Sequence, residues 1–331
     1  EACLLRPAQA WADDNIRFHA VPALAIDTAL RSVRLADGQD LSYRSLLLAT
    51  GGRVRTLSVP GSDLPQVMTL RTLDDAAALA PRLGAGVRLL VVGGGFIGLE
   101  VAASARQLGS VVTLVEGAPR LLGRAVPADL ADRVLTLHRA RGVDVRLGVL
   151  PDSIESHGSG LRVRLNDGST LDVDTVVVGI GIEPATDLAR AAGLVVERGI
   201  RVDATLRTNA SDVFAAGDVA EFPSVVSGQP IRQETWLNAE TQARIAAQNM
   251  LGGQQVYAQM PWFWSDQYDH QLQVSGEPAS GEQSVARDLG EDDQITFHLD
   301  ARQRLVGMSA WGLGRRTAKE FRLARALVEK R

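Results

Sequence analysis

The chain has 331 residues, 45% of them hydrophobic, and a formal net charge of −4. This length allows two or three globular domains, and the slight negative charge predicts no nucleic-acid partner and no membrane attachment. No apolar run reaches the roughly 18 residues that span a bilayer, and no signal-peptide pattern opens the chain, so we expect a cytoplasmic protein. Cys3 is the only cysteine, which excludes an intrachain disulfide, a cysteine-ligated cluster and a CxxC redox pair.

The first predicted elements are two strands and a third strand that ends in small residues. Strands are expected at 31–35 and 39–43, separated by an Asp-Gly turn. Residues 46–48 are apolar and precede Ala49 to Gly51, a turn that lets the backbone approach a ligand at the carboxyl edge of a parallel sheet. Taken alone, this stretch fits any buried strand about equally well.

The stretch that follows residue 87 has a strand–turn–helix pattern. Residues 88–92 predict a buried parallel strand, and residues 96–108 have helical spacing with alanines on the packing face. The glycines lie between them: Gly93 permits the tight turn, Gly95 allows close approach of a pyrophosphate, and Gly98 lets the helix pack tightly on the strand. Phosphates would then meet free N–H groups at a helix N-terminus. A glycine-rich turn without a ligand is the alternative.

An acid ends the next predicted strand, residues 111–115. Glu116 lies eighteen residues after Gly98, at the place where a carboxylate binds the adenosine ribose hydroxyls. It would repel a 2′-phosphate by up to roughly 4 kcal/mol, so the sequence predicts a preference for NADH over NADPH. Arg120 and Arg124 follow closely, and an arginine there could accommodate a 2′-phosphate.

The middle of the chain repeats the pattern of a buried strand with a glycine turn. A helix is expected at 127–140, a strand at 143–147 and a hairpin around the Asn-Asp-Gly at 166–168. Residues 176–178 then form an apolar strand that leads to Gly181. Two strands that end in glycine turns indicate two nucleotide-binding units.

A second carboxylate follows a short apolar strand near residue 213. Gly217 and Asp218 end that strand, which places an acid at a sheet edge beside a residue without a side chain. Such an acid can accept hydrogen bonds from a polyol such as the ribityl chain of a flavin. A solvated loop aspartate is the alternative, and this stretch alone leaves the two equal.

The last third predicts a helix and a small antiparallel domain. A helix begins near Glu234 and continues to Met250, and Trp236 could cover an electron-rich ring at its N-terminus. Four aromatic residues lie within 261–268, and alternation up to residue 307 predicts an antiparallel sheet. Residues 315–331 form a helix with seven Lys or Arg against two Glu, which is either a solvated face or a dock for an acidic protein.

Taken together, these motifs resemble the FAD-dependent ferredoxin reductases of oxygenase systems, which serve biphenyl-type dioxygenases and putidaredoxin-linked cytochromes P450. The resemblance covers essentially the whole chain and includes the spacing between motifs. Its residues are 46–52, 93–98 with Glu116, 179–184, 208–218, 234–242 and 261–268.

The resemblance implies roles for particular residues. Asp218 would bind the ribityl chain of FAD, Ala49 to Gly51 would lie along the FAD, and Arg55 would contact the dinucleotide. Glu100 would lie near the nicotinamide and Trp236 beside the flavin, which makes these two the predicted catalytic residues. The predicted cofactor-binding residues are Ala49, Thr50, Gly51, Arg55, Gly93, Gly95, Phe96, Ile97, Gly98, Glu116, Arg124, Gly181, Gly217, Asp218, Glu234 and Trp236.

The predicted fold is α/β, with two doubly wound dinucleotide-binding domains of the glutathione-reductase type and a C-terminal α+β domain with an antiparallel sheet. Residues 1–72 and 198–258 are expected in the FAD-binding domain, 73–197 in the NAD-binding domain and 259–331 in an interface domain. The family opens with a βαβ unit of roughly 30 residues that has its own GxGxxG, and this sequence begins after it. We expect the physical molecule to carry that unit. Its strand is central in the sheet, and without it the sheet would be split and the two neighbouring strands exposed.

The resemblance implies transfer of hydride from NADH to FAD, followed by single-electron transfer to a 2Fe-2S ferredoxin. The absence of a redox cysteine pair favours this external acceptor over a disulfide substrate. An NADH oxidase, a monodehydroascorbate-type reductase and an NAD-binding module without flavin are the alternatives. The expected assembly is a monomer or homodimer, without a metal site.

Overall fold

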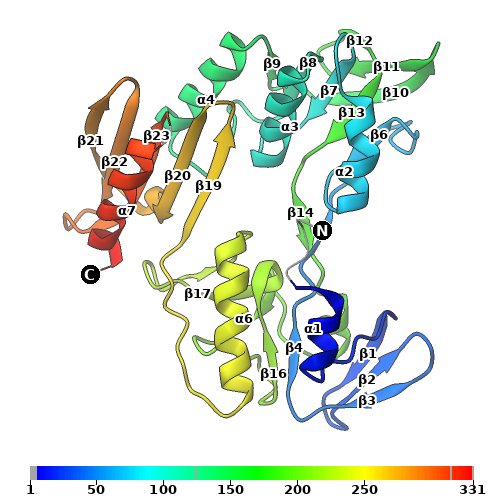
Figure 1. The fold of residues 1–331 in the computed structure, drawn as a ribbon, viewed down its shortest axis with the longest axis vertical. Coiled ribbons are helices and arrows are strands. Elements are labelled where there is room, and N and C mark those ends of the chain that lie inside the picture. The colour runs from blue at the N-terminus through cyan, green and yellow to red at the C-terminus, as the bar shows by residue number, and fades with distance from the viewer. Residues whose placement is uncertain (1–5, 124, 314, 330–331) are drawn as a thin grey trace.

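The computed structural model describes residues 6–123, 125–313 and 315–329. Figure 1 shows three parts: a central sheet with its helices at upper right, a lower lobe that contains α6, and a C-terminal sheet at left. None of the helices within the described ranges is long and apolar enough to cross a membrane.

The central sheet has five parallel strands and holds the predicted strand–turn–helix. Its strand β7 is almost completely excluded from solvent from Leu89 to Val92, as expected for an apolar run covered on both faces. The order is β6 (Val67–Thr69), β13 (Thr175–Val178), β7 (Arg88–Val92), β8 (Val111–Glu116) and β9 (Asp144–Leu147). Its helices are α2 (Leu73–Leu79), the 3-10 turn η1 (Ala80–Arg82), α3 (Phe96–Gln107) and α4 (Ala128–Ala140).

An antiparallel sheet packs against this core through its own apolar face. Its three strands are β10 (Pro151–His157), β11 (Gly160–Leu165) and β12 (Thr170–Val173). Ile154, Leu161 and Val163 join Leu90 and Val92 of β7 in one buried cluster. The predicted hairpin at 166–168 is the turn between β11 and β12.

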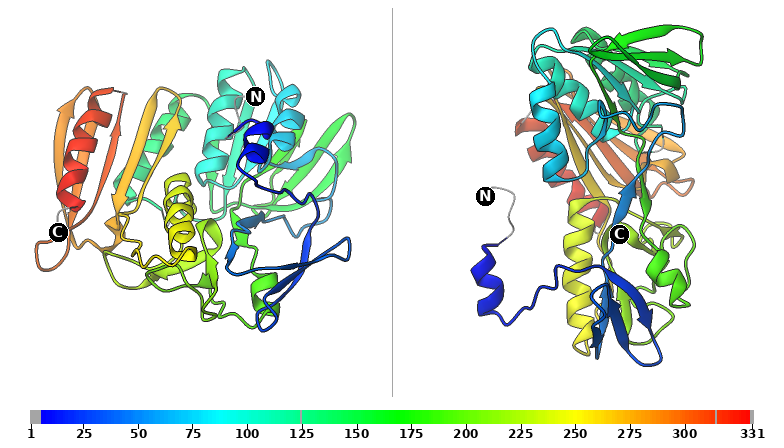
Figure 2. Two further views of the ribbon diagram at one scale, coloured as in Figure 1. Left: turned by 60° about the horizontal axis from the view of Figure 1, so that its bottom comes forward. Right: turned by 90° about the vertical axis from the view of Figure 1, so that its right-hand side faces the viewer.

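The lower lobe is built from short strands and one long helix. Strand β4 (Leu46–Leu48) pairs in parallel with β16 (Val213–Ala215), and α6 (Trp236–Met250) packs against both. The other elements are α1 (Ala8–Asp13), β1 (Ala23–Asp27), β2 (Ser32–Leu35), β3 (Asp40–Ser42), α5 (Asp187–Ala191), β15 (Ile200–Arg201), η2 (Gly217–Val219), β17 (Ala220–Pro223) and β18 (Pro230–Ile231). The right-hand view of Figure 2 shows α1 standing away from the rest of the lobe.

Two antiparallel segments connect the lower lobe to the central sheet. They are β5 (Gly52–Val54) and β14 (Ile182–Pro184), which pair with each other. Because β5 follows the turn at Ala49 to Gly51 and β14 follows β13, the pair brings a loop of each part to the junction.

The C-terminal part is a five-stranded antiparallel sheet covered by a helix, as expected from the alternation. The strand order is β19 (Trp262–Gln267), β20 (His270–Gly276), β23 (Leu305–Gly312), β22 (Asp293–Leu299) and β21 (Gln283–Gly290), with the 3-10 turn η3 (Pro278–Ser280). Helix α7 (Arg315–Glu329) packs Phe321 and Ala324 onto it.

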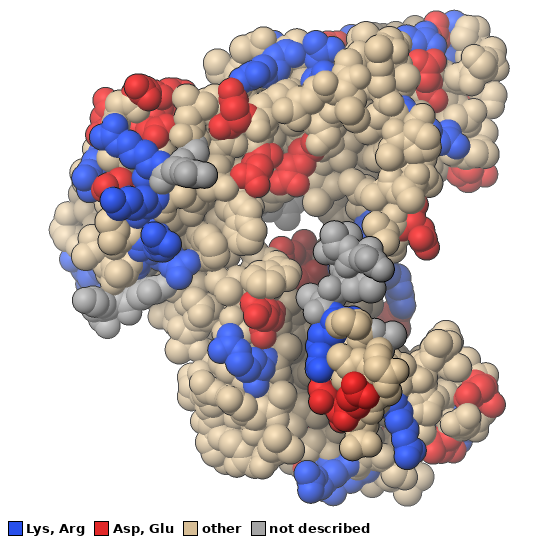
Figure 3. All heavy atoms as spheres, viewed as in Figure 1, with Lys and Arg blue, Asp and Glu red and all other residues tan. Residues whose placement is uncertain are grey.

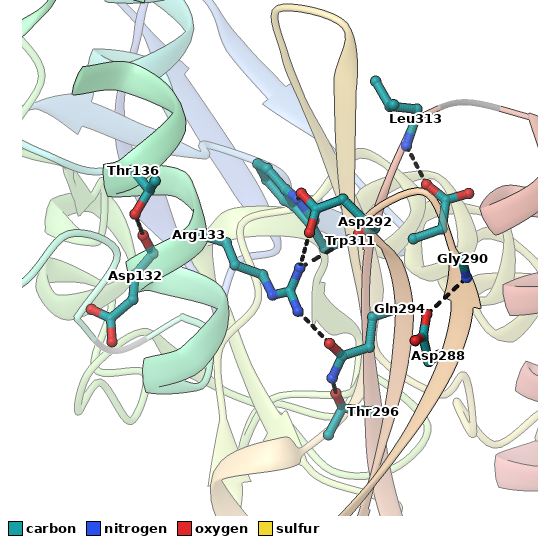
Figure 4. Close-up of polar contacts among 11 residues, drawn as sticks. Asp132, Arg133, Thr136, Asp288, Gly290, Asp292, Gln294, Thr296, Trp311 and Leu313 are labelled. Carbon is teal, nitrogen blue, oxygen red and sulfur yellow. Dashed lines mark hydrogen bonds and ion pairs between the residues drawn. The ribbon is translucent and has the colours of Figure 1, made fainter. Parts of the chain in front are cut away.

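Helix α4 joins the central sheet to the C-terminal sheet. The guanidinium of Arg133 donates to Asp292 Oδ1 at 2.7 Å and to Gln294 of β22, and the indole of Trp311 also donates to Asp292 (Figure 4). Directly after α4, Arg141 donates to both carboxylate oxygens of Asp269. The C-terminal sheet is therefore fixed relative to the central sheet along one side of α4.

One sequence-based inference was wrong. The turn at 179–181 does not mark a second nucleotide-binding unit, because β13 lies beside β7 in the same sheet. The two glycine turns pack against each other, with Gly179 filling the space next to Gly93. Periodicity predicted both strands but could not show that they are neighbours.

Candidate functional site

The loop between β7 and α3 has the geometry that its glycines predict. Gly93 adopts φ +110°, and a Cβ there would lie 2.4 Å from Gly179 O. A Cβ on Gly98 would lie 2.0 Å from Gly93 O, whereas a Cβ on Gly95 would have no atom nearer than 4.0 Å. Gly93 and Gly98 are thus required by packing, and the backbone at Gly95 borders space that a pyrophosphate can approach.

Glu116 lies at the carboxyl end of β8 and faces this loop. Its carboxylate accepts hydrogen bonds from the N–H of Gly94 at 2.6 Å and of Ala118 at 2.7 Å. Each carboxylate oxygen retains a lone pair for a further donor. The side chain is therefore held at the loop in a position to accept from ribose hydroxyls. Arg124, which was also predicted to bind cofactor, lies outside the described residues.

Glu100 is on the second turn of α3 and faces the C-terminal sheet. Its carboxylate accepts a hydrogen bond from the hydroxyl of Ser265 on β19. Burial raises the pKa of Glu100, the hydrogen bond from Ser265 lowers it, and the like charge of Asp266 raises it. Phe96, at the start of the same helix, makes an edge contact with Phe263 of β19 at a centroid separation of 5.2 Å. Ile97, the next residue of the helix, is 49% exposed.

The junction brings together the loop after β4 and the glycine turn after β13. The hydroxyl of Thr50 donates to Ala185 O at 2.7 Å, and Ala185 N donates to Gly51 O. Arg55 N donates to Gly181 O, and its guanidinium donates to Ile182 O. These bonds use the backbone of the junction, while Ala49 and Thr50 stay exposed to solvent.

Asp218 lies at the centre of a charged group in the lower lobe. Its carboxylate is 3.4 Å from a guanidinium nitrogen of Arg71, and its carbonyl accepts from Arg232 at 2.9 Å. Arg232 in turn pairs with Glu234 at 2.6 Å, immediately before α6. Trp236 is the first residue of α6 and is 62% exposed. Its indole ring is therefore accessible to a ligand at the N-terminus of this helix.

Two buried side-chain amide nitrogens, on glutamines near this group, lack hydrogen-bond partners within the described ranges. Gln242 Oε1 accepts from Gly217 N at 2.8 Å, but Gln242 Nε2 has no hydrogen-bond partner, and neither has Gln233 Nε2. A buried donor without a partner costs about 1–3 kcal/mol, so these groups suit a polar ligand. Gly217 adopts φ +79°, and a Cβ there would lie 3.5 Å from the Cβ of Ala239 on α6.

The elements that carry these residues converge on one strand. Strand β19 contacts both α3, which holds Glu100, and α6, which begins at Trp236. Figure 3 shows a hollow between the lower lobe and the upper part of the molecule on the face viewed, with charged side chains along the edges of the hollow. The arrangement can hold one dinucleotide on the central sheet and another on the lower lobe, and β19 contacts a helix of each.

Sequence reasoning missed several residues of the site. Arg71 lies at the end of β6 and Ser265 in an antiparallel strand, far in sequence from their partners Asp218 and Glu100. No motif marks Arg71, and the 261–268 stretch contains Ser265 without indicating its role. Arg232 precedes the predicted 234–242 stretch and Gln242 ends it, but their contacts with Asp218 and Gly217 depend on tertiary packing.

These features define the glutathione-reductase class of fold, in which two dinucleotide sites share one junction. Family models agree: one described as pyridine nucleotide-disulphide oxidoreductase matches residues 10–243, and one described as reductase C-terminal matches residues 262–331. The chain belongs to the pyridine nucleotide-disulphide oxidoreductase family.

Named relatives confirm the predicted resemblance. The chain is 44% identical over 303 residues to the "anthranilate 1,2-dioxygenase system ferredoxin–NAD(+) reductase component" of Burkholderia cepacia, covering 91% of this chain and 75% of that protein. It is 38% identical to rhodocoxin reductase of Rhodococcus erythropolis, covering 94% and 73%. The solved covalent putidaredoxin reductase–putidaredoxin complex matches with a TM-score of 0.91 and 35% identity, covering 99% of this chain and 79% of that one. The predicted fold class is thereby confirmed.

Proposed function

We propose that this chain belongs to an NADH-dependent, FAD-containing ferredoxin reductase that supplies a 2Fe-2S ferredoxin of an oxygenase system. The observation that carries the proposal is the convergence on β19 of the helix that follows the Gly93–Gly98 loop and the helix that follows Asp218. Relatives named as ferredoxin–NAD(+) reductase components of dioxygenase systems support it.

NADH is held by the loop and helix of the central sheet. The first N–H groups of α3 have no partners within the helix and would donate to a pyrophosphate that passes over Gly95. Glu116 accepts from the adenosine ribose hydroxyls, which favours NADH because a 2′-phosphate would meet a carboxylate. Glu100 would hold the carboxamide end of a bound nicotinamide.

The lower lobe and the junction would hold FAD. Asp218 would accept from the ribityl hydroxyls, the turn at Ala49 to Gly51 would lie along the cofactor, and Arg55 would contact the dinucleotide. Arg71, paired with Asp218 and 3.6 Å from the place where a Cβ on Gly51 would lie, adds a cation that the sequence did not indicate. When bound, FAD accepts a hydride and releases electrons one at a time.

Two other parts of the proposal concern domains and partners. We assign residues 67–184 to the NAD-binding domain, since β6 belongs to the central sheet and α5 packs in the lower lobe, the rest of residues 1–258 to the FAD-binding domain, and residues 259–331 to the interface domain. The ferredoxin docks near the flavin edge. The cytoplasmic location and the state of assembly as monomer or homodimer stay predictions.

The decisive experiment uses the full-length gene product. We expect a yellow protein whose flavin absorbance NADH bleaches under anaerobic conditions, and whose turnover depends on an added 2Fe-2S ferredoxin. The control is the same assay with O2 or a small quinone as the acceptor. A colourless protein would contradict the flavin assignment, and fast turnover without an iron–sulfur protein would favour an oxidase.

A further inference from the structure

A buried chain of hydrogen bonds leads away from Glu100 through the C-terminal sheet. Ser265 Oγ donates to Glu100, Gln267 Nε2 donates to Ser265 Oγ at 2.9 Å, and Gln267 Oε1 lies 2.9 Å from His138 Nε2. Ser265 is 2% exposed, and Gln267 and His138 are completely buried. The chain crosses three elements, α3, β19 and α4, and begins at a partly buried carboxylate.

The direction of every bond in the chain follows from its chemistry. Because the amide nitrogen of Gln267 donates to Ser265, its oxygen is left to accept, and His138 Nε2 must carry a hydrogen. Burial lowers the pKa of His138, while its hydrogen bond with Gln267 raises it. The ring is therefore neutral near pH 7, with its proton on Nε2. All three donors then point toward Glu100, which is the arrangement that stabilises an anion at its end.

The strand geometry explains why β19 can provide this support. Side chains alternate across a strand, so Phe263, Ser265 and Gln267 share one face of β19. Phe263 contacts Phe96 and Ser265 contacts Glu100, both on α3, while Gln267 reaches α4. One face of β19 therefore packs against and hydrogen-bonds to α3, the helix that begins at the Gly93–Gly95 turn.

We infer that Ser265, Gln267 and His138 are positioning residues of the hydride-transfer site, which fix the Glu100 carboxylate in one orientation and keep it ionised. This inference rests on the proposed function, since it takes Glu100 to face the nicotinamide. The C-terminal domain then has a role in NADH oxidation in addition to its role as an interface. It supplies two of the three groups, Ser265 and Gln267, that orient Glu100 of the central domain.

The chain has an evident consequence for pH. Burial and Asp266 oppose ionisation of Glu100, and the hydrogen bond from Ser265 favours it. His138 is at the end of the hydrogen-bond chain that is farthest from Glu100, and Asp266 follows Ser265 directly on β19. Removing the Ser265 hydroxyl should therefore raise the pKa of Glu100. A protonated Glu100 would accept more weakly from the carboxamide, because it has lost its negative charge.

The first test measures the carboxyl group directly, in the full-length flavoprotein without nicotinamide. Carbon-13 NMR with labelled glutamate, assigned through Glu100→Gln, should show a higher pKa for Glu100 in Ser265→Ala and in Gln267→Leu than in the wild type. The matched control is Ser275→Ala, which removes another completely buried serine hydroxyl that donates to Pro261 O in the same sheet. An unchanged titration of Glu100 in Ser265→Ala would overturn the inference.

The second test follows flavin reduction by NADH in anaerobic stopped flow. Ser265→Ala should lower the rate at saturating NADH by about ten- to a hundredfold and move the acidic limb of the pH profile upward. The dissociation constant of NADH, set mainly by the loop and Glu116, should stay within about threefold. Ser265→Thr, which keeps the hydroxyl, should restore both the rate and the limb, and Ser275→Ala should leave them unchanged.

A double-mutant cycle separates positioning from general damage. In a Glu100→Gln background, Ser265→Ala should have no further effect on the rate, because the two residues act together. Additive losses would overturn the inference. If NADH fails to reduce the wild-type flavin at all, the proposed function fails instead, while the NMR titration still reports on the chain.

Discussion

Gly95 caps the N-terminus of α3 and Gly98 lies in its first turn, and the two glycines are required for different reasons. Gly98→Ala would place a Cβ 2.0 Å from Gly93 O, and we expect a loss of about 3 kcal/mol of stability. Gly95 has φ −82° and no atom within 4 Å of its Cβ position other than Gly179 O at 4.0 Å. Gly95→Ala should therefore stay within about 1 kcal/mol of the wild type.

NADH affinity, measured separately from stability, should show what Gly95 contributes. Gly95→Ala should weaken NADH binding by about tenfold or more, since its methyl group occupies the space of the pyrophosphate. Urea unfolding and NADH titration of both variants check this. A Gly95→Ala protein with normal NADH affinity would show that the pyrophosphate does not pass over this residue.

We expect Glu116 to set the preference for NADH over NADPH. Glu116→Ala should weaken NADH binding and narrow the preference over NADPH, because it removes both an acceptor and a repulsive charge. The carboxylate also holds the N–H groups of Gly94 and Ala118, so Glu116→Gln, which keeps one acceptor, serves as the second variant. The measurement is kcat/KM for both nucleotides, with Glu155→Ala on the exposed hairpin as control. An unchanged preference would place the ribose carboxylate elsewhere.

At the scale of elements, the contact between α4 and the C-terminal sheet contains two buried histidines. His138 of α4 bonds Gln267, and His298 of β22 lies in the field of Asp129 on α4. Burial lowers the pKa of both, and the smaller opposing effects are the bond with Gln267 and the charge of Asp129. Both rings are thus neutral in the folded protein at a pH where the unfolded chain would protonate them.

This contact should weaken in mild acid. Below about pH 6.5 the unfolded state binds more protons than the folded state, so stability falls with decreasing pH until the folded pKa is reached. The slope should be at most about 1.4 kcal/mol per pH unit for each histidine. Urea unfolding between pH 7.5 and 5.5 checks this, and His298→Gln should show a shallower slope than the wild type. Equal slopes in the two proteins would show that His298 is protonated as easily in the fold as in the unfolded chain.

For the whole molecule, charge is distributed unevenly even though the net charge is small. Helix α7 presents Arg316, Lys319 and Arg322 to solvent, whereas the chain as a whole carries −4. The side chain of Arg315 lies outside the described residues. A basic surface on an acidic protein is suited to steer an acidic partner.

Neutralising this helix should therefore affect the ferredoxin and not NADH. Neutral substitution of Arg315 and Arg316 should raise the KM for ferredoxin and reduce the salt dependence of turnover. Neutral substitution of the exposed Arg190 on α5 is the control. If only the parameters for NADH change, α7 is not the docking surface.

The sequence predicted the elements well where one periodicity dominates. The β7 strand, the α3 helix and the hairpin at 166–168 formed as expected, because their apolar spacing and turn residues act within a few positions. It could not show that β13 lies beside β7, or that β5 and β14 pair, since short segments carry no signal for their partner strand.

The site divides in the same way. Glycine spacing, Glu116 and Asp218 could be read from the sequence, because a phosphate turn and an acid at a strand end each depend on local backbone geometry. The partners Arg71 for Asp218 and Ser265 for Glu100 were decided only by the tertiary structure. Each pair joins residues more than a hundred positions apart, and only the packing of α3, β19 and α6 around one junction brings such groups within hydrogen-bond distance.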